Sequence, residues 1–521
     1  MPLPLLAALV SACGRAPNDM ESGAQETGRD PATAAWVSAG VDSAVEEKAS
    51  PPRRVLLVVV DDMSAMSSSM YAEDFPDVHF RSAPMPNVEG ICESGVRFRQ
   101  AWSAPICAAS RATMFTGRHG FRNGGTELLG NDSDHLPVDE PTLPRLLAQA
   151  NPSIKSASFG KYNLGHTDDN GGDRAPNEMG WSHFAGALDA SVPNYFSWSR
   201  TVDGVTDTST TYATTQTVDD TIAWLAEQGP DQPWMVWLAF NAPHAPFHAP
   251  PSELHDYNLR DGSAPPTGPL DPDVVLPYYL AASQAMDTEL GRLLQWMRDN
   301  GQGDTDILFI ADNGSPLEVI ESPMDPARGK STVFEGGIHV PFCVSGPSVA
   351  QGGRVDDRPV GAVDILATVL DLQGAPAPEE LNDAVFDGQS IAPILRDPQA
   401  QLGRDWAFSE GPASPGYSPY GAARALTQGG DKLIRFTDLG EESLYDLTSD
   451  PFEFADRLAD AESDGDHDDD HDDEDDQDRQ QGRQGPEAEE DREDDSSQIN
   501  DAVLRGQALG DLIDTLTTQP G

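Results

Sequence analysis

Short, uninterrupted apolar runs are the feature that most constrains the fold of this chain. Residues 55–60 read Val-Leu-Leu-Val-Val-Val, and comparable runs occupy 234–240, 307–311 and 340–344. Continuous apolarity over so few residues is typical of strands that are buried on both faces, as in a parallel sheet covered by helices. Helical patterns alternate with these runs at 142–150, 217–228, 276–300 and 363–372. The alternation predicts an α/β fold with a largely parallel central sheet flanked by helices.

The chain changes character after about residue 400. Two segments of alternating polarity, 432–436 and 443–447, predict a small antiparallel unit, and an amphipathic helix is expected at 501–516. Residues 462–497 are rich in Asp and Glu without apolar periodicity, so we expect a disordered acidic insert there. We therefore expect a main α/β domain at 53–398 and a smaller C-terminal α+β subdomain at 399–521, which contains the insert.

Charge and cysteine content narrow the function further. The formal net charge is −54, and phosphate binding needs a basic face, so we expect no nucleic-acid partner. The four cysteines are widely spaced and do not indicate a disulfide framework. Cys92 lies in a helical stretch and Cys343 in an apolar run, and we expect both to be small core residues.

The N-terminal segment predicts export. An apolar run at 3–10 leads into Val10-Ser11-Ala12-Cys13, which resembles a bacterial lipobox, although no Lys or Arg precedes the run. We expect 1–13 to be a lipoprotein-type signal segment, with lipidation of Cys13, and 14–52 to be a flexible tether to the cell envelope. The alternatives are a soluble exported protein and a cytoplasmic one. No later run approaches the ~18 apolar residues that span a bilayer.

Acidic residues follow two of the predicted strands directly. Asp61 and Asp62 come after the run at 55–60, and Asp312 and Asn313 come after the run at 307–311. The carboxyl ends of parallel strands form the crevice in which α/β sheets place their ligands. Oxygen donors without paired Cys or His spacing favour Ca²⁺, with Mg²⁺ as the alternative, over zinc. Either pair alone could instead be a helix N-cap or a turn.

Cys107 begins the pattern Cys107-x-Ala109-x-Arg111, which is followed by Thr116-Gly117-Arg118. Together with the two acid pairs, this pattern resembles the signature of the sulfatase family, in which a dedicated maturase oxidises the cysteine to formylglycine. Taken alone, the pattern is also compatible with a buried thiol at a helix start. Further landmarks follow in the family's order: Gly95-Val96-Arg97-Phe98, Gly160-Lys161-Tyr162-Asn163-Leu164-Gly165, Ala242-Pro243-His244-Ala245-Pro246 and Gly329-Lys330-Ser331-Thr332-Val333-Phe334-Glu335-Gly336-Gly337.

The resemblance implies an alkaline-phosphatase-like fold, with 53–398 as the catalytic domain, and hydrolysis of a sulfated small molecule or glycan. The hydrated aldehyde of residue 107 would be the nucleophile, held by Arg111. Lys161 and Lys330 would bind sulfate oxygens, and His244 would be the general acid for the leaving oxygen, with Lys330 as its rival. The remaining implied role is metal binding, by Asp61, Asp62, Cys107, Asp312 and Asn313.

The chain departs from the family pattern at two positions. Ala109 stands where many members have proline, and Asn163 stands where the family has a histidine that helps to release sulfate. An amide cannot accept a proton at neutral pH, so we expect either a substitute, such as His166, or slow release. The alternative functions are phosphonate or phosphodiester hydrolysis within the same superfamily and non-catalytic binding of sulfated glycans. Substrate choice is expected to reside in the loops at 168–205 and 252–272.

Overall fold

The computed structural model describes residues 54–125, 135–229, 231–266, 271–412, 418–459 and 490–519, with side chains of the last stretch described from Asp501 onward. The predicted signal segment, the tether, Cys13 and positions 462–489 of the expected acidic insert lie outside these residues. The domain boundaries expected at 53–398 and 399–521 stay predictions.

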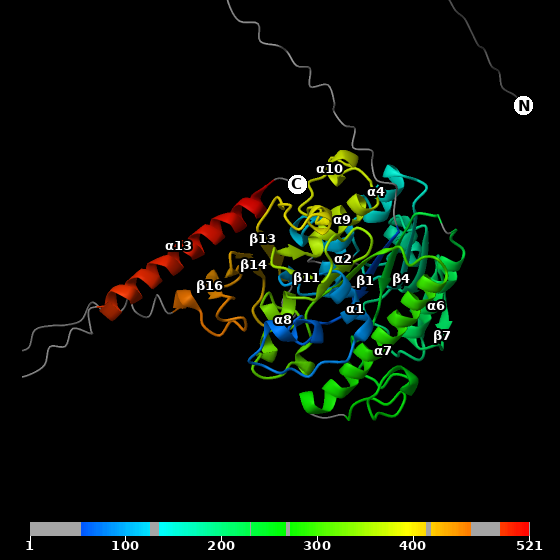
Figure 1. Ribbon diagram of the computed structural model, residues 1–521, viewed down its shortest axis with the longest axis horizontal. Helices are drawn as coiled ribbons and strands as arrows, with labels where there is room; N and C mark the ends of the chain where they lie inside the picture. The colour runs from blue at the N-terminus through cyan, green and yellow to red at the C-terminus, as the bar shows by residue number, and fades with distance from the viewer. Residues whose placement is uncertain are drawn as a thin grey trace, which may run out of the picture. The chain divides into compact units, whose positions relative to one another are not determined.

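A ten-stranded sheet forms the centre of the described chain, in the order β11-β2-β10-β9-β1-β8-β4-β5-β6-β7. Figure 1 labels β11, β1, β4 and β7 of this sheet from left to right. Its five central strands run parallel: β9 (Asp306–Ala311), β1 (Val55–Val60), β8 (Trp234–Ala239), β4 (Lys155–Lys161) and β5 (His183–Ala187). Every residue of β1 is buried, because β1 has paired neighbours at both edges and helices over both faces. The predicted α/β fold with a largely parallel sheet is confirmed.

The outer strands of this sheet add antiparallel pairs. On one side β10 (Phe342–Ser345) pairs antiparallel with β9 and with β2 (Val96–Phe98), and β11 (Arg354–Asp356) is the edge strand. On the other side β6 (Trp198–Val202) and β7 (Val205–Ser209) follow β5. A further pair, β3 (Ala101–Trp102) and β12 (Val360–Gly361), lies outside the large sheet. Apolar periodicity predicts that a strand exists but carries no information about its direction, which depends on its connections.

The helices form two groups, and β1 and β4 lie between them in Figure 1. In one group α7 (Pro272–Asp299) contacts α1 (Pro86–Ser94) and α6 (Ala213–Ala226). In the other, α9 (Ile365–Leu372) contacts α2 (Cys107–Thr116) and α4 (Leu143–Ala150). Helix α7 begins four residues before its predicted start, because the Asp271 side chain accepts from the Asp273 N–H and Pro272 occupies the first turn.

The C-terminal sheet is antiparallel, as predicted, in the order β13-β14-β15-β16: Trp406–Glu410, Ala423–Gln428, Asp431–Phe436 and Glu441–Asp446. Alternate side chains of β15 serve its two faces. Leu433 packs with residues of the C-terminal helix α13 (Glu490–Thr518), whereas Ile434 packs towards Phe334 and Trp102 of the main domain. Full burial of one such side chain contributes about 2 kcal/mol. Both faces of this sheet are therefore covered, one by α13 and the other by the main domain.

Two expectations are corrected. Cys92 and Cys343 are joined by a disulfide that links α1 to β10, with a Cα–Cα distance of 5.1 Å, so they are not separate core thiols. Sequence spacing could not reveal this pair, because the two cysteines are 251 positions apart and only the fold brings them together. Residues 490–497, expected within the disordered insert, belong to helix α13. None of the described helices combines the length and apolarity that crossing a membrane requires.

Candidate functional site

The two predicted acid pairs meet at the carboxyl ends of β1 and β9. These strands are parallel neighbours, with Val60 opposite Ala311, so the residues that follow them lie side by side. The Asp62 N–H donates to Asp312 Oδ1 at 3.2 Å, and Asn313 Nδ2 donates to Asp62 Oδ1 at 2.7 Å. All four side chains are buried. The placement follows from the register of two strands that are far apart in the sequence.

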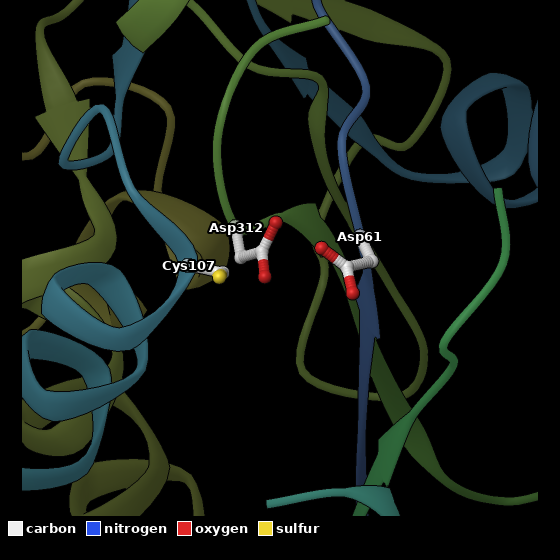
Figure 2. A group of neighbouring side chains, drawn as sticks. All are labelled: Asp61, Cys107 and Asp312. Carbon is white, nitrogen blue, oxygen red and sulfur yellow. The ribbon is translucent and has the colours of Figure 1, made fainter. Parts of the chain in front are cut away.

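Cys107 and Arg111 approach this cluster from α2. Cys107 is the first residue of the helix and is buried, and Arg111, one turn later, lies on the same helix face. Both Nε and Nη2 of Arg111 donate to Asp312 Oδ2, at 3.0 and 2.7 Å, and its Nη1 donates to the Lys161 carbonyl. Figure 2 shows the Asp312 carboxylate between the Cys107 sulfur and the Asp61 carboxylate. The four-residue spacing of the motif therefore brings a thiol and a guanidinium to one carboxylate.

Two lysines and a histidine complete the cluster. Lys161, the last residue of β4, donates to Asp61 Oδ2 at 2.5 Å, and Lys330 donates to Asp62 Oδ1. His244 places Nε2 3.8 Å from Asp62 Oδ2, while its Nδ1 lies 2.6 Å from the Ala245 carbonyl. The side chains of His244 and Lys330 keep 19% and 18% of their surface exposed, whereas Asp61, Arg111 and Lys161 keep none. The predicted site residues thus converge, with His244 and Lys330 on the solvent side.

The donor set fits a divalent cation with oxygen ligands. Ligand atoms of Asp61, Cys107 and Asp312 all lie within 4.8 Å of one another. Asp61 Oδ1 and Asn313 Oδ1 are buried and have no hydrogen-bond partner. Unpartnered buried oxygens are expensive, and a cation would satisfy both. The carboxylates of Asp61, Asp62 and Asp312 face the cations of Arg111, Lys161 and Lys330, so their formal charges cancel. A bound divalent cation would make the site positive.

Burial and neighbouring charges shift the pKa values in this cluster. Burial raises the pKa of Asp61, but Lys161, His244 and Arg111 outweigh it and hold the pKa well below its usual range. Burial and the charge of Asp61 raise the pKa of Asp312 to about 6. Burial lowers the pKa of His244, against the opposing effect of Asp61 and Asp62.

The pKa of Lys330 is raised, in contrast to the pKa of His244. Burial acts to lower its pKa, but Asp62 and other negative groups nearby outweigh burial and raise the pKa. Lys330 therefore carries its protons throughout the physiological pH range.

Asn163 contacts the sulfur directly. Its Nδ2 lies 3.1 Å from Cys107 Sγ, so the side chain occupies the position from which a histidine would reach residue 107. His166, the expected substitute, instead places Nε2 2.9 Å from Asp189 Oδ1. The geometry thus pairs the nucleophile candidate with an amide that can donate a hydrogen bond but cannot accept a proton at neutral pH.

Three of the six described non-glycine residues with positive φ lie at this site. Asp62, Asn163 and Ser331 have φ values of 68°, 52° and 77°, in the left-handed region that non-glycine residues rarely adopt. Each such residue costs on the order of 1–3 kcal/mol, so the surrounding contacts must hold it in place. At this site the strain falls on residues that carry or adjoin the groups described above, an arrangement that is typical of functional sites.

Two tyrosines that the sequence analysis did not predict form hydrogen bonds to backbone carbonyls of the site. Tyr279 of α7 donates its hydroxyl hydrogen to the Asp62 carbonyl at 2.7 Å. The Tyr195 hydroxyl lies 2.7 Å from the carbonyls of both Asn241 and His244, within the turn that carries His244. Residues 168–205, expected to be a substrate-selecting loop, contain β5 and β6, and Tyr195 lies between these two strands. Tyr279 lies within the predicted helix, where the apolar pattern does not distinguish it.

Two family models match the chain. The model described as sulfatase matches residues 53–375, and the model described as N-sulphoglucosamine sulphohydrolase, C-terminal, matches residues 328–467. The first covers more than half of the chain and contains every residue of the cluster.

Proteins of similar sequence are also named as sulfatases. An uncharacterized sulfatase, YdeN, of Escherichia coli (strain K12) is 28% identical over 60% of this chain and 57% of its own length. The N-acetylgalactosamine-6-sulfatase of Homo sapiens is 27% identical over 66% of each chain. The chain thus spans between about half and two thirds of the length of these relatives.

Solved structures share the fold. Ps i-CgsB in complex with k-i-k-neocarrahexaose has a TM-score of 0.65 at 20% identity, over 79% of this chain and 90% of that one. The phosphonate monoester hydrolase of Agrobacterium radiobacter has a TM-score of 0.58 at 20% identity, over 79% of this chain and 93% of its own. At these identities the likeness concerns the fold alone.

Proposed function

Because the chain belongs to the sulfatase family, we propose that it hydrolyses sulfate esters with formylglycine made from Cys107 and a divalent cation. One observation carries the proposal. A buried cysteine at a helix start shares a set of metal-donor atoms with Asp61 and Asp312, and Arg111, Lys161, Lys330 and His244 surround that set. No separate role in the core explains why three carboxylates and three cations gather around one thiol.

Asp61, Asp62, Asp312 and Asn313 would hold the cation together with residue 107, and we infer Ca²⁺, with Mg²⁺ as the alternative. When bound, the cation would stabilise the alkoxide form of the formylglycine hydrate, so that an oxygen nucleophile exists near neutral pH. The two unpartnered buried oxygens of Asp61 and Asn313 support this assignment. Lys161 and Lys330, which now pair with these carboxylates, would then be released towards the substrate.

Two lysines would bind the anionic end of the ester, and Arg111 would hold residue 107 beside them. Arg111 is fixed by hydrogen bonds from its Nε, Nη1 and Nη2, which orients it towards residue 107. Lys161 and Lys330 would contact the sulfate oxygens and offset the charge that moves onto the leaving oxygen. Locally positive charge is needed here because the net charge of −54 repels anionic esters at long range.

His244 and Lys330 are the two candidates for protonating the leaving oxygen. With Nδ1–H donating to the Ala245 carbonyl, neutral His244 presents Nε2 as an acceptor only. We propose that His244 donates from its doubly protonated form, with Lys330 as the rival donor. The pH profile separates them, because a histidine donor loses activity as pH rises through its pKa, whereas Lys330 keeps its protons.

The substrate is proposed to be a sulfated glycan or small molecule. The human relative is named for an N-acetylgalactosamine 6-sulfate activity, and one fold neighbour was solved with a neocarrahexaose. Partly exposed His244 and Lys330 mark the side from which such an ester would enter. We also propose maturation by a formylglycine-generating enzyme, and export with lipidation at Cys13, which palmitate labelling of wild type and Cys13→Ala in the native host would test.

The decisive experiment has two parts. Mass spectrometry of the tryptic peptide that carries residue 107, from protein made in the native host, should show an aldehyde in place of the thiol. Rates on matched aryl sulfate, aryl phosphonate and phosphodiester substrates should favour the sulfate. Faster phosphonate cleavage would support the alternative drawn from the shared fold. An intact thiol, with glycan binding that survives Cys107→Ala, would indicate a non-catalytic binding protein.

A further inference from the structure

The segment that carries Lys330 is held at both ends by one residue of the C-terminal region. Arg328 Nη1 donates to the Glu453 carbonyl, and the Glu335 N–H donates to Glu453 Oε2 at 2.7 Å. Glu453 is 1% exposed and lies seven residues after β16. Its φ of 61° is in the left-handed region, a strained conformation that the fold must impose. A single residue outside the main sheet thus fixes both ends of residues 328–335.

Lys432 pairs with both Glu453 and Glu335. It is completely buried on β15, with Nζ 2.9 Å from Glu335 Oε1 and 2.7 Å from Glu453 Oε1, and it lies 4.8 Å from the Trp102 ring centroid. A lysine buried this deeply needs charged partners, and removal of one partner of such a pair is strongly destabilising. The ammonium therefore ties Glu453 to Glu335 within the interface between the two sheets.

Residues 328–335 are also fastened on the side of the nucleophile. The Lys330 N–H donates to the Ser315 carbonyl at 2.9 Å, and the Ser331 N–H donates to the Pro105 carbonyl, two residues before Cys107, also at 2.9 Å. A Cβ added at Gly337 would lie 2.1 Å from the Thr332 carbonyl oxygen, so the segment packs tightly against α8 (Glu335–Ile338). The middle of the segment is therefore anchored beside Cys107, while its two ends are anchored at Glu453.

We propose that Glu453, supported by Lys432, is a positioning residue that sets the place of the Lys330 ammonium in the site. The proposal rests on the proposed function, in which Lys330 binds the ester. Glu453 touches neither substrate nor metal donors and acts only through the ends of residues 328–335. The C-terminal sheet then contributes to catalysis by locating one group, in addition to its packing.

A double-mutant cycle tests this. Glu453→Gln keeps an oxygen acceptor for the Glu335 N–H but removes the charge that pairs with Lys432. It should lower kcat/KM about tenfold in the wild-type background and less than about twofold in a Lys330→Ala background, because the effect passes through Lys330. Glu410→Gln is the matched control. Glu410 is a buried glutamate at the end of β13 that accepts a main-domain N–H, from Phe121 at 2.6 Å, yet its described hydrogen bonds and ion pairs do not reach residues 328–335. Equal losses for Glu453→Gln in both backgrounds, or equal losses for the two glutamine variants, would overturn the proposal.

A second readout does not depend on turnover. Acetylation of lysines with acetic anhydride, followed by peptide mass spectrometry, should label Lys330 several-fold faster in Glu453→Gln than in wild type or Glu410→Gln. The exposed Lys155 serves as internal reference and should label equally in all three proteins. If wild type releases no sulfate but Lys330 labelling changes as expected, the proposed function fails and the positioning role stands. Unchanged Lys330 labelling would refute the positioning role, whatever the activity.

Discussion

The candidate site has two halves that differ in how the fold supports them. Asp61, Asp312, Arg111 and Lys161 stand at strand ends or in the first turns of a helix, and their side chains are completely buried. His244 and Lys330 stand on loops and keep about a fifth of their side-chain surface exposed. The buried half has the rigidity that a cation and a nucleophile need, and the loop half has the access that an ester needs. We therefore expect changes to the first half to remove function and changes to the second to reduce it.

The largest effect is expected for the nucleophile. Cys107→Ala should lower sulfate-ester hydrolysis by at least about 10³-fold, because no other described group can take the nucleophilic role. The melting temperature should change little, since Cys107 is a small side chain beside Ile106 in the smallest apolar cluster. Steady-state rates and thermal melting check both statements. A variant with more than a tenth of wild-type activity would contradict the assignment.

Removal of a buried carboxylate should impair both the metal site and the fold. Asp312→Asn removes the negative charge that pairs with Arg111, which donates two hydrogen bonds to Asp312 Oδ2. Breaking such a buried ion pair costs about 3–5 kcal/mol. Activity should fall about 10²-fold or more, with loss of the divalent cation that is proposed to bind here. Metal analysis and chemical denaturation measure the two effects. Retention of full metal content would show that Asp312 is not a ligand.

In the loop half, Lys330→Ala and His244→Ala should each lower kcat/KM about 10- to 100-fold while metal content stays at the wild-type level. If His244 is the proton donor, its removal should also abolish the fall in kcat at high pH. Metal loss in either variant would contradict the division of the site into two halves.

Asn163→His should give a smaller effect in the opposite direction. The Asn163 amide lies 3.1 Å from Cys107 Sγ, and a histidine there could accept the proton that sulfate release requires. The left-handed φ of 52° suits His, which is enriched in that region among non-glycine residues. We expect kcat to rise a few-fold. An unchanged kcat with normal metal content would show that another group already performs this step.

The smallest effect on activity is expected at Glu410, whose described hydrogen bonds and ion pairs involve neither half of the site. Burial raises the pKa of Glu410 from 4.5 to about 7, against the effects of the Phe121 N–H and Arg424. Between these pH values the folded state holds the proton that the unfolded state has released. The contribution of Glu410 therefore lowers the free energy of unfolding as pH rises from about 4.5 to 7. Above pH 7 the loss is constant, at most about 3 kcal/mol.

Glu410→Gln should remove this loss. Its melting temperature relative to wild type should rise between pH 5 and pH 8, while kcat/KM stays unchanged. A difference in melting temperature that does not depend on pH would show that Glu410 titrates normally.

The apolar runs predicted some strands of the central sheet but not all of them. The runs at 55–60, 234–240 and 307–311 form central strands, because a strand covered on both faces must be apolar throughout. Strand β4, which ends in Lys161, went unrecognised, since Lys155, Ser156 and Ser158 interrupt its apolar pattern. Lys161 itself was found only through the family resemblance, which does not depend on periodicity.

The sequence by itself determined the kinds of chemical groups at the site and the segments that carry them. Acid pairs directly after apolar runs, and a thiol four residues before a guanidinium, are local patterns that a linear reading can see. Only the tertiary structure decided that Cys92 pairs with Cys343, that β10 runs antiparallel to β9, and that Glu453 holds both ends of the Lys330 segment. These contacts join residues that are between 32 and 251 positions apart, and chain packing, which no local pattern encodes, brings them together.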